Sequence, residues 1–431
     1  MTENLPVTPD NIASTYNPVA KTKTPRLPLI LGLILLAFVL DVLLFYTFVT
    51  NKRVSEGDFY IPWKASQEML FNGRNPYSDE VTALIQVGMT GQVFDKDVPD
   101  RLSFNYPLYD ALLLAPFTPL PYPLAEAIWN VTNQFALILL VWQLTRLVGW
   151  QPRGVIRTGL YLWAFLFYSC IFTIGWGQYT ILTLLAIVLG ARLLQSGRYN
   201  WAGLMLALAL FKPQTAGVLV GLLLLWCLFH FSTRWRTLLS FGLSFGLMLV
   251  EPMLWQADWL KQWLDSSAYR RLHPGMYSGA EEVVHYNLGV SWDNVFGPGL
   301  VLAGILSIAL IWLWWRLGPD LYNRLFPQLL ALGGLVTLIA LPQFGGANDM
   351  VLYPALFWGG AWLALHFKGR VLLLAFVATI VLPYLLIFGI GFMSWWIPLR
   401  AIIILVAYIW TIWLVRQQLQ ARPQLQMESL N

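Results

Sequence analysis

Apolar residues in this chain form long segments that short polar stretches separate. These segments fall near residues 28–50, 122–148, 155–174, 179–195, 200–211, 213–230, 235–255, 298–316, 324–342, 350–366, 370–392 and 396–416. Most of them have about 17–25 residues, which is enough for an α-helix to cross a hydrocarbon layer about 30 Å thick. The pattern predicts an all-α, polytopic membrane protein with about twelve transmembrane helices.

The weakest boundary in this pattern lies between segments 200–211 and 213–230, where Lys212 precedes Pro213. Proline removes a backbone donor and interrupts a helix. We therefore expect two short spans that meet near one face of the membrane.

Basic residues mark alternate loops and so predict the orientation. Short loops rich in Lys and Arg stay in the cytoplasm. With twelve spans, the basic loops all fall on that side, and both termini are cytoplasmic. We expect a multi-pass plasma-membrane protein with a disordered cytoplasmic tail at 1–27, a membrane domain at 28–417 and a second cytoplasmic tail at 418–431.

Two stretches on the predicted outer side are long, at 51–107 and 256–297. Long loops inside a compact domain are usually functional. Phe59–Phe71 mixes apolar and polar residues as an amphipathic helix on a membrane surface does. Leu108–Leu120 is too short to span and contains several prolines, which predicts a second interfacial or re-entrant helix.

Composition agrees with a membrane location and narrows the possible functions. Hydrophobic residues make up 58% of the chain, charged residues make up 11%, and the mean hydropathy is +0.60. These values exclude an ordinary soluble or disordered protein. The net charge of +5 comes from Lys and Arg at helix ends, so nucleic-acid binding is not expected. Cys170 and Cys227 lie in apolar segments and predict neither a disulfide framework nor a Cys/His metal site.

Two charged residues on the outer side are the first candidates for chemistry. Asp58 precedes the first predicted interfacial helix, where a carboxylate could accept a proton from an incoming hydroxyl or could cap the helix. Lys212 lies in an apolar stretch, where a charge is costly unless it faces a cavity or a counter-ion. It could bind a phosphate or extend to the membrane surface.

Two polar turns on the same side are further candidates. Gly175-Trp176-Gly177-Gln178 allows close backbone approach and presents an amide, although a plain tight turn explains it equally well. Asn348 and Asp349 follow a glycine-rich turn, and Asp349 could instead cap the next helix.

The stretch 256–297 contributes Arg270, Arg271, His273 and His285. Adjacent arginines suit phosphate recognition, but a solvated face or lipid headgroups explain them too. The two histidines lack a third ligand in any metal-binding pattern. Asp41 and Glu251 lie in or near predicted spans and have no assigned role.

Several motifs together resemble a known family. They are Gly57-Asp58-Phe59-Tyr60, Asn72-Gly73-Arg74-Asn75-Pro76-Tyr77, Phe104-Asn105-Tyr106-Pro107-Leu108, Gly177-Gln178-Tyr179 and Leu210-Phe211-Lys212-Pro213. In this order they are similar to motifs of glycosyltransferase family 87, in the GT-C superfamily of membrane enzymes. The chain departs from the family pattern at Tyr106-Pro107-Leu108, which has one proline, at Tyr179-Thr180, and at Asn348-Asp349, which has no neighbouring His.

The resemblance implies inverting, metal-independent sugar transfer on the outer face, with no cofactor. The implied donor is a polyprenyl-phosphate sugar such as polyprenyl-phosphate mannose, and the acceptor is a lipid-linked molecule or glycan. By carry-over Asp58 is the base. The cations available for the donor phosphate are Lys212, Arg270 and Arg271. The expected substrate contacts are Tyr60, Tyr106, Gln178, His273, His285, Asn348 and Asp349.

Two other functions fit a polytopic membrane protein. A transporter or lipid flippase predicts broken helices in corresponding positions of both halves, whereas only the Lys212-Pro213 break is clear in this sequence. A non-catalytic membrane scaffold is the third possibility, and the gathering of polar residues on one side disfavours it.

Overall fold

The computed structural model describes residues 27–52, 57–95, 101–271, 298–340, 346–367, 369–388, 406–413 and 416. All regular elements in these residues are helices, and the described part contains no strand. The predicted all-α fold is therefore confirmed. The predicted tails, apart from Leu27, lie outside the described residues. Residues 272–297 of the second outer stretch lie outside them too.

The helices follow the apolar segments closely. In chain order they are α1 (Leu27–Phe48), η3 (Thr50–Lys52), α2 (Tyr60–Asn72), α3 (Asp79–Thr90), α4 (Tyr109–Leu114), α5 (Tyr122–Leu147), α6 (Gly154–Leu166), α7 (Tyr168–Gly175), α8 (Thr180–Gln195), α9 (Tyr199–Leu208), η4 (Ala209–Phe211), α10 (Pro213–Phe229), α11 (Phe231–Val250), η5 (Glu251–Leu254), α12 (Trp259–Arg271), α14 (Pro298–Ala340), η6 (Gly346–Leu352), α15 (Tyr353–His366) and α16 (Gly369–Phe388).

Three helices of the described part are long and apolar enough to cross a membrane, namely Leu27–Lys52, Tyr122–Leu147 and Phe231–Leu254. The first and third bury only 6% and 11% of their apolar windows inside the protein. Exposed leucines over a whole helix are stable in lipid but not in water. The chain is therefore a membrane protein, and the count of twelve spans stays a prediction.

The segment predicted as one span at 155–174 is broken. Helices α6 and α7 meet at an angle of 54°, because Phe167 between them has an extended backbone with φ −61° and ψ 127°. The ring of Phe167 is buried and packs 5.4 Å from that of Tyr353. The bend therefore lies where Phe167 packs against the start of α15.

The chain stays helical from Pro298 to Ala340, where two spans joined by a polar turn were predicted. A helix satisfies its backbone groups internally, which favours continuation in an apolar environment even through a Gly-Pro pair. The segments predicted at 298–316 and 324–342 therefore belong to one helical element, and the number of spans in it stays a prediction.

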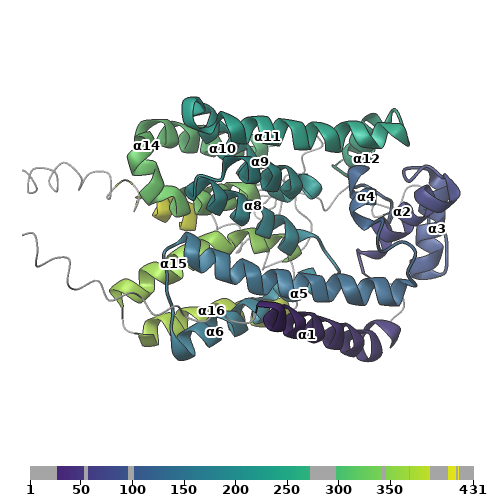
Figure 1. The fold of residues 1–431 in the computed structure, drawn as a ribbon, viewed down its shortest axis with the longest axis horizontal. Helices are drawn as coiled ribbons and strands as arrows, with labels where there is room; N and C mark the ends of the chain where they lie inside the picture. Colours follow the sequence, from purple (N-terminus) through teal and green to yellow (C-terminus); the bar gives the residue numbers. More distant parts are fainter. Residues whose placement is uncertain are drawn as a thin grey trace, which may run out of the picture.

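Helices α2, α3 and α4 gather at one end of the bundle (Figure 1). Helix α2 lies where the first interfacial helix was predicted, but eight of its 13 residues are buried. It therefore packs inside protein, mostly against α3 and α4, and does not simply rest on a membrane surface. Helix α4 has six residues, because the proline-rich segment after Leu114 continues as turns.

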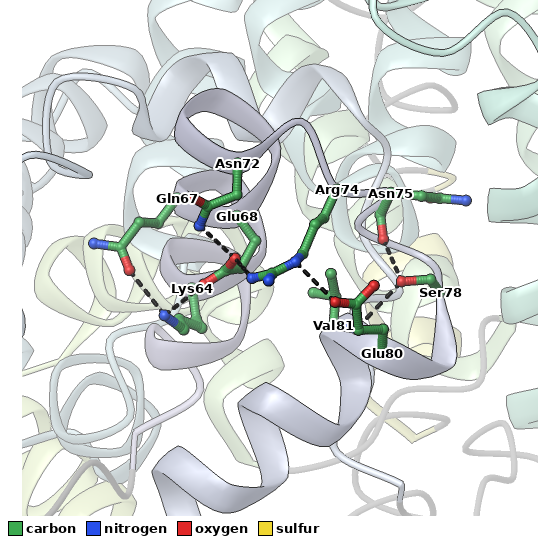
Figure 2. Close-up of polar contacts among 9 residues, drawn as sticks. All are labelled: Lys64, Gln67, Glu68, Asn72, Arg74, Asn75, Ser78, Glu80 and Val81. Carbon is green, nitrogen blue, oxygen red and sulfur yellow. Dashed lines mark hydrogen bonds and ion pairs between the residues drawn. The ribbon is translucent and has the colours of Figure 1, made fainter.

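A charged network holds the turn between α2 and α3 (Figure 2). Glu68 exposes only 3% of its surface and binds Lys64, Asn72 and Arg74 at 2.7, 2.6 and 2.5 Å. Helix α2 ends at Asn72, and the next residue, Gly73, has a φ of +63°, which favours glycine. The helix predicted at Phe59–Phe71 is therefore observed within one residue of its predicted bounds.

Helix α12 joins this end of the molecule. The indole of Trp263 donates to the carbonyl oxygen of Asn105 at 3.1 Å. Trp259 is fully buried, with its ring 5.8 Å from that of Tyr109 on α4. The start of the stretch 256–297 therefore packs against the end of the stretch 51–107 and against α4.

Candidate active site

Three residues from separate parts of the chain meet at the end of the bundle that carries α2–α4. Asp58 precedes α2, Gln178 lies between α7 and α8, and Lys212 lies between η4 and α10. The Gln178 amide nitrogen donates to Asp58 Oδ2, and Lys212 Nζ donates to Gln178 Oε1 at 2.5 Å. A single amide therefore links a carboxylate to an ammonium group.

The turn before Gln178 is built for close contact with the Asp58 segment. Gly177 has φ +69°, and a Cβ on it would lie 2.6 Å from the Cβ of Phe59. The Phe59 N–H donates to the Trp176 carbonyl at 3.2 Å, and the Trp129 indole donates to the Gly177 carbonyl at 2.7 Å. Glycine at 177 is therefore required twice, for its backbone conformation and for its lack of a side chain.

The alternative roles of Asp58 and Lys212 do not match their positions. The N-cap residue of α2 is Phe59, not Asp58. Lys212 exposes only 2% of its surface, so it does not extend to the membrane surface. Its ammonium also donates to Thr180 Oγ1 at 2.8 Å. Both charges instead face the interior of the site.

Burial tunes the charge of Lys212. It lowers the pKa of this ammonium to about 7, while Asp58 and Asp110 partly oppose the shift. An ordinary lysine has a pKa near ~10.4. The break that carries Lys212 is held by Tyr109, whose hydroxyl donates to the Leu210 carbonyl at 2.8 Å.

Asp110 on α4 is a buried carboxyl group that the sequence-based search missed. It is fully buried, and neither of its side-chain oxygens has a hydrogen-bond partner among the described residues. Burial raises its pKa well above the usual range, although Lys212 opposes the shift. An acidic residue inside the apolar stretch 108–120 was the available signal, and it is the same signal that identified Lys212.

Asn348 and Asp349 on η6 form hydrogen bonds with α10, which begins after Lys212, and with α7, which ends before Gln178. The Asn348 Oδ1 accepts from the hydroxyl of Thr215, in the first turn of α10, at 3.4 Å. Asp349 is fully buried and accepts a hydrogen bond from the Tyr168 hydroxyl on α7. The N-cap residue of α15 is Leu352, so Asp349 does not cap that helix. The structure links both residues to elements of the site without joining them to Asp58.

The two predicted tyrosines differ in their placement. The Tyr106 ring packs 5.4 Å from that of Tyr179, the neighbour of Gln178, and so borders the site. The Tyr60 hydroxyl lies against Gly88 of α3, and its ring packs 4.9 Å from that of Tyr122. Tyr60 therefore fills space between helices on the α3 side.

The remaining predicted residues belong to the second outer stretch. Arg270 and Arg271 are the last residues of α12, and their side chains are not among those described. His273 and His285 lie outside the described residues. Within the described part, no group of three or more His, Cys, Asp or Glu could hold a metal ion.

Comparison with known proteins gives one match. The model of glycosyltransferase family 87 matches residues 104–342, a region that contains Gln178 and Lys212. No curated protein and no solved structure shows a significant match.

Proposed function

Because the chain belongs to glycosyltransferase family 87, we propose that it moves a hexose, specifically mannose, from a polyprenyl-phosphate sugar to a lipid-linked or glycan acceptor. The family establishes that the protein is a glycosyltransferase. The sugar, the donor, the acceptor and the location of the reaction on the outer face of the membrane are our proposal.

One observation carries this proposal: Asp58 binds the nitrogen and Lys212 binds the oxygen of the same Gln178 amide group. Sugar transfer from a lipid phosphate needs a group that takes the acceptor proton and a cation near the leaving phosphate. The Asp58–Gln178–Lys212 chain supplies both at a fixed separation. Its amide orients the carboxylate and the ammonium towards one site.

The proposed reaction is a single displacement. The acceptor oxygen attacks the anomeric carbon from the face opposite the phosphate, and its proton passes to the Asp58 carboxylate. The bond between the anomeric carbon and the phosphate oxygen breaks, and its electron pair stays on the phosphate. The configuration inverts. A lipid phosphate leaves readily, so no second carboxyl group is needed as an acid.

Lys212 is the proposed cation for the phosphate. An ammonium group has three donors, and the bonds to Gln178 and Thr180 use two of them. Since Lys212 is 98% buried, the phosphate reaches the third donor only after a covering side chain moves. The charge then acts in a site with little water, where it stabilises the departing phosphate strongly.

The test compares two carboxyl groups of the same cluster. Asp58→Asn should lower the transfer of labelled mannose from polyprenyl-phosphate mannose by about 100-fold or more, because it removes the base. Asp110→Asn is the matched control, since this carboxyl group is fully buried and has no hydrogen-bond partner among the described residues. We expect this control to retain transfer within a few fold (~3-fold).

Both variants are assayed in proteoliposomes after their expression and thermal unfolding are matched to the wild type. Retained transfer in Asp58→Asn would overturn the assignment of the base. A wild-type protein that transfers no sugar from any polyprenyl-phosphate donor would overturn the donor class instead.

A further inference from the structure

At the end of the bundle opposite α2–α4, arginines come from a part of the sequence that contains no acidic residue. From residue 127 to residue 250 the chain contains no Asp or Glu. The same segment contains seven arginines, at Arg146, Arg153, Arg157, Arg192, Arg198, Arg234 and Arg236. The proposed sugar transfer uses none of them.

Two of these arginines line one cavity. Arg198 and Arg236 line a shallow cavity of about 320 Å³ that is open to the outside and is also lined by Gly197, Tyr199, Asn200 and Trp201. No ion pair of the described part involves either arginine. Two guanidinium groups at one cavity repel each other, and an anion between them would remove this repulsion. Their planar donors match phosphate oxygens.

The cavity is held in shape by contacts between α11 and the start of α9. Thr237 donates to the Tyr199 carbonyl at 3.1 Å, and Ser240 donates to the Asn200 carbonyl at 2.7 Å. Gly203 lets the two helices touch, because a Cβ there would collide with the backbone of Thr237. The arginines are therefore mounted on a fixed frame and need little ordering on binding.

An apolar face leads away from this cavity along α11. Leu239, Leu243 and Leu247 follow Arg236 at spacings of three, seven and eleven residues, and so lie on one helix face with it. These leucines expose 51%, 68% and 68% of their surface. Helix α11 begins a candidate membrane span at Phe231, so Arg236 lies near the end of that span. Trp201 and Trp235 are exposed beside it, as tryptophans are at headgroup level.

The cavity is remote from the candidate active site. Residues 199–211 of α9 and η4 separate it from Lys212, which is about 20 Å along a helix. Helix α11 runs from this region towards α12 and α4 (Figure 1). A ligand of the cavity therefore does not contact Asp58 or Lys212, and it lies near the ends of α5 and α8 that carry Arg146 and Arg192.

We propose that the Arg198–Arg236 cavity binds the phosphate of an anionic membrane lipid whose acyl chain lies along Leu239, Leu243 and Leu247. The lipid comes from the leaflet opposite the candidate active site. The two arginines favour an anionic headgroup over a zwitterionic one. The exposed leucines favour a lipid, which has an acyl chain, over a free phosphate ion.

The test measures the binding of phosphatidylglycerol to the full-length protein by native mass spectrometry. Arg198→Gln/Arg236→Gln should weaken the tightest bound lipid by about 30-fold, since each arginine near a headgroup contributes on the order of tenfold or less. Arg153→Gln/Arg157→Gln is the control, because it removes the same charge from exposed positions at the same end. It should leave that affinity unchanged.

Equal loss in both double variants would overturn the proposal, because the attraction would then be diffuse. Competition by inorganic phosphate at millimolar concentration, or equal binding of phosphatidylcholine, would also overturn it in favour of a general anion or lipid surface. The single substitution Leu243→Ala should also weaken phosphatidylglycerol binding. Unchanged binding in this variant would show that the leucine face is not part of the site.

Discussion

At the scale of single residues, Lys212 determines most of what this site can do. It is buried between two apolar helices and bound to Gln178 and Thr180. Burial lowers its pKa to about 7, so its charge changes within the physiological range. A cation tuned in this way can bind a phosphate without leaving a permanent charge in an apolar bundle.

The pH dependence of donor binding follows from this pKa. Lys212 is cationic below pH 7 and neutral above it, so the KM for the donor should rise about tenfold by pH 8 to 9 in the wild type. Lys212→Arg keeps its charge over the whole range and should show a flat KM between pH 6 and 9. The measurement is the donor KM at each pH, with pH 6 as the common reference. Parallel curves for both proteins would remove Lys212 from phosphate binding.

At the scale of elements, the short connections place the functional groups. The segment 57–59, the turn 175–178 and the break at Lys212 touch one another although they are far apart in the chain. Each is a place where the helical backbone ends, so its polar groups are available for contacts outside the helix. The long helices mainly hold these connections in position.

Two neighbouring glycines test the turn. In Gly177→Ala the new Cβ meets Phe59 at 2.6 Å and the backbone keeps a φ of +69°. This change should destabilise the protein by about 1–3 kcal/mol and lower transfer, because Gln178 and Asp58 move apart. Gly175→Ala has nothing within 4 Å of the new Cβ and should behave like the wild type. Thermal unfolding and transfer rate decide this prediction, and equal behaviour of the two variants would contradict it.

The Glu68 network tests the connection between α2 and α3 (Figure 2). Burial opposes the ionisation of Glu68, but hydrogen bonds from Lys64, Asn72 and Arg74 outweigh it and lower its pKa. The stabilisation is therefore present above the ordinary pKa of glutamate and is lost as the pH falls below it. Glu68→Gln should cost about 1–2 kcal/mol at pH 7, because its basic partners are partly exposed.

The same arginine provides the control for this network. Glu80 binds Arg74 at 2.8 Å but has 63% of its side chain exposed. Glu80→Gln should change stability by less than about 0.5 kcal/mol. Thermal unfolding at pH 7 and pH 4 distinguishes the variants, and the gap between wild type and Glu68→Gln should shrink at pH 4. A gap independent of pH would contradict the ionic explanation.

At the scale of the whole molecule, charge separates the two ends of the bundle. Helices α5 and α8 run side by side in the same direction, as the contact of Trp129 with Tyr179 near their starts indicates. Their last turns carry Arg146 and Arg192. The candidate active site lies at the starts of both helices. Such an asymmetry predicts an arginine-rich cytoplasmic end and an outer site.

Cysteine labelling in intact cells tests this orientation. Cys170 and Cys227 are buried and should give little background. A membrane-impermeant maleimide should label Gln92→Cys, exposed just after α3, in intact cells. It should label Ser196→Cys, exposed after α8, only after the membrane is permeabilised. Labelling of both positions from one side would contradict the orientation.

Much of the fold could be predicted because a membrane imposes local rules. Helices α1, α5 and α11 follow from uninterrupted apolar length, and the break at Lys212-Pro213 follows from a missing backbone donor. The bend at Phe167 could not be predicted, because no proline or glycine marks it and the contact of Phe167 with Tyr353 joins distant parts of the chain. The helical backbone between the predicted segments 298–316 and 324–342 was not predicted either.

The candidate site divides in the same way. Asp58, Gln178 and Lys212 were recognisable in the sequence, because polar residues in an apolar chain are costly and stand out. Their hydrogen bonds to one another, the fully buried Asp110 beside them and the inward position of Tyr60 against α3 depend on which helices pack together. Residue type and local spacing alone determine where a membrane chain can be helical and where it is polar. Only the tertiary structure decides which polar groups meet, since contacts between residues 34 and 120 positions apart leave no local pattern.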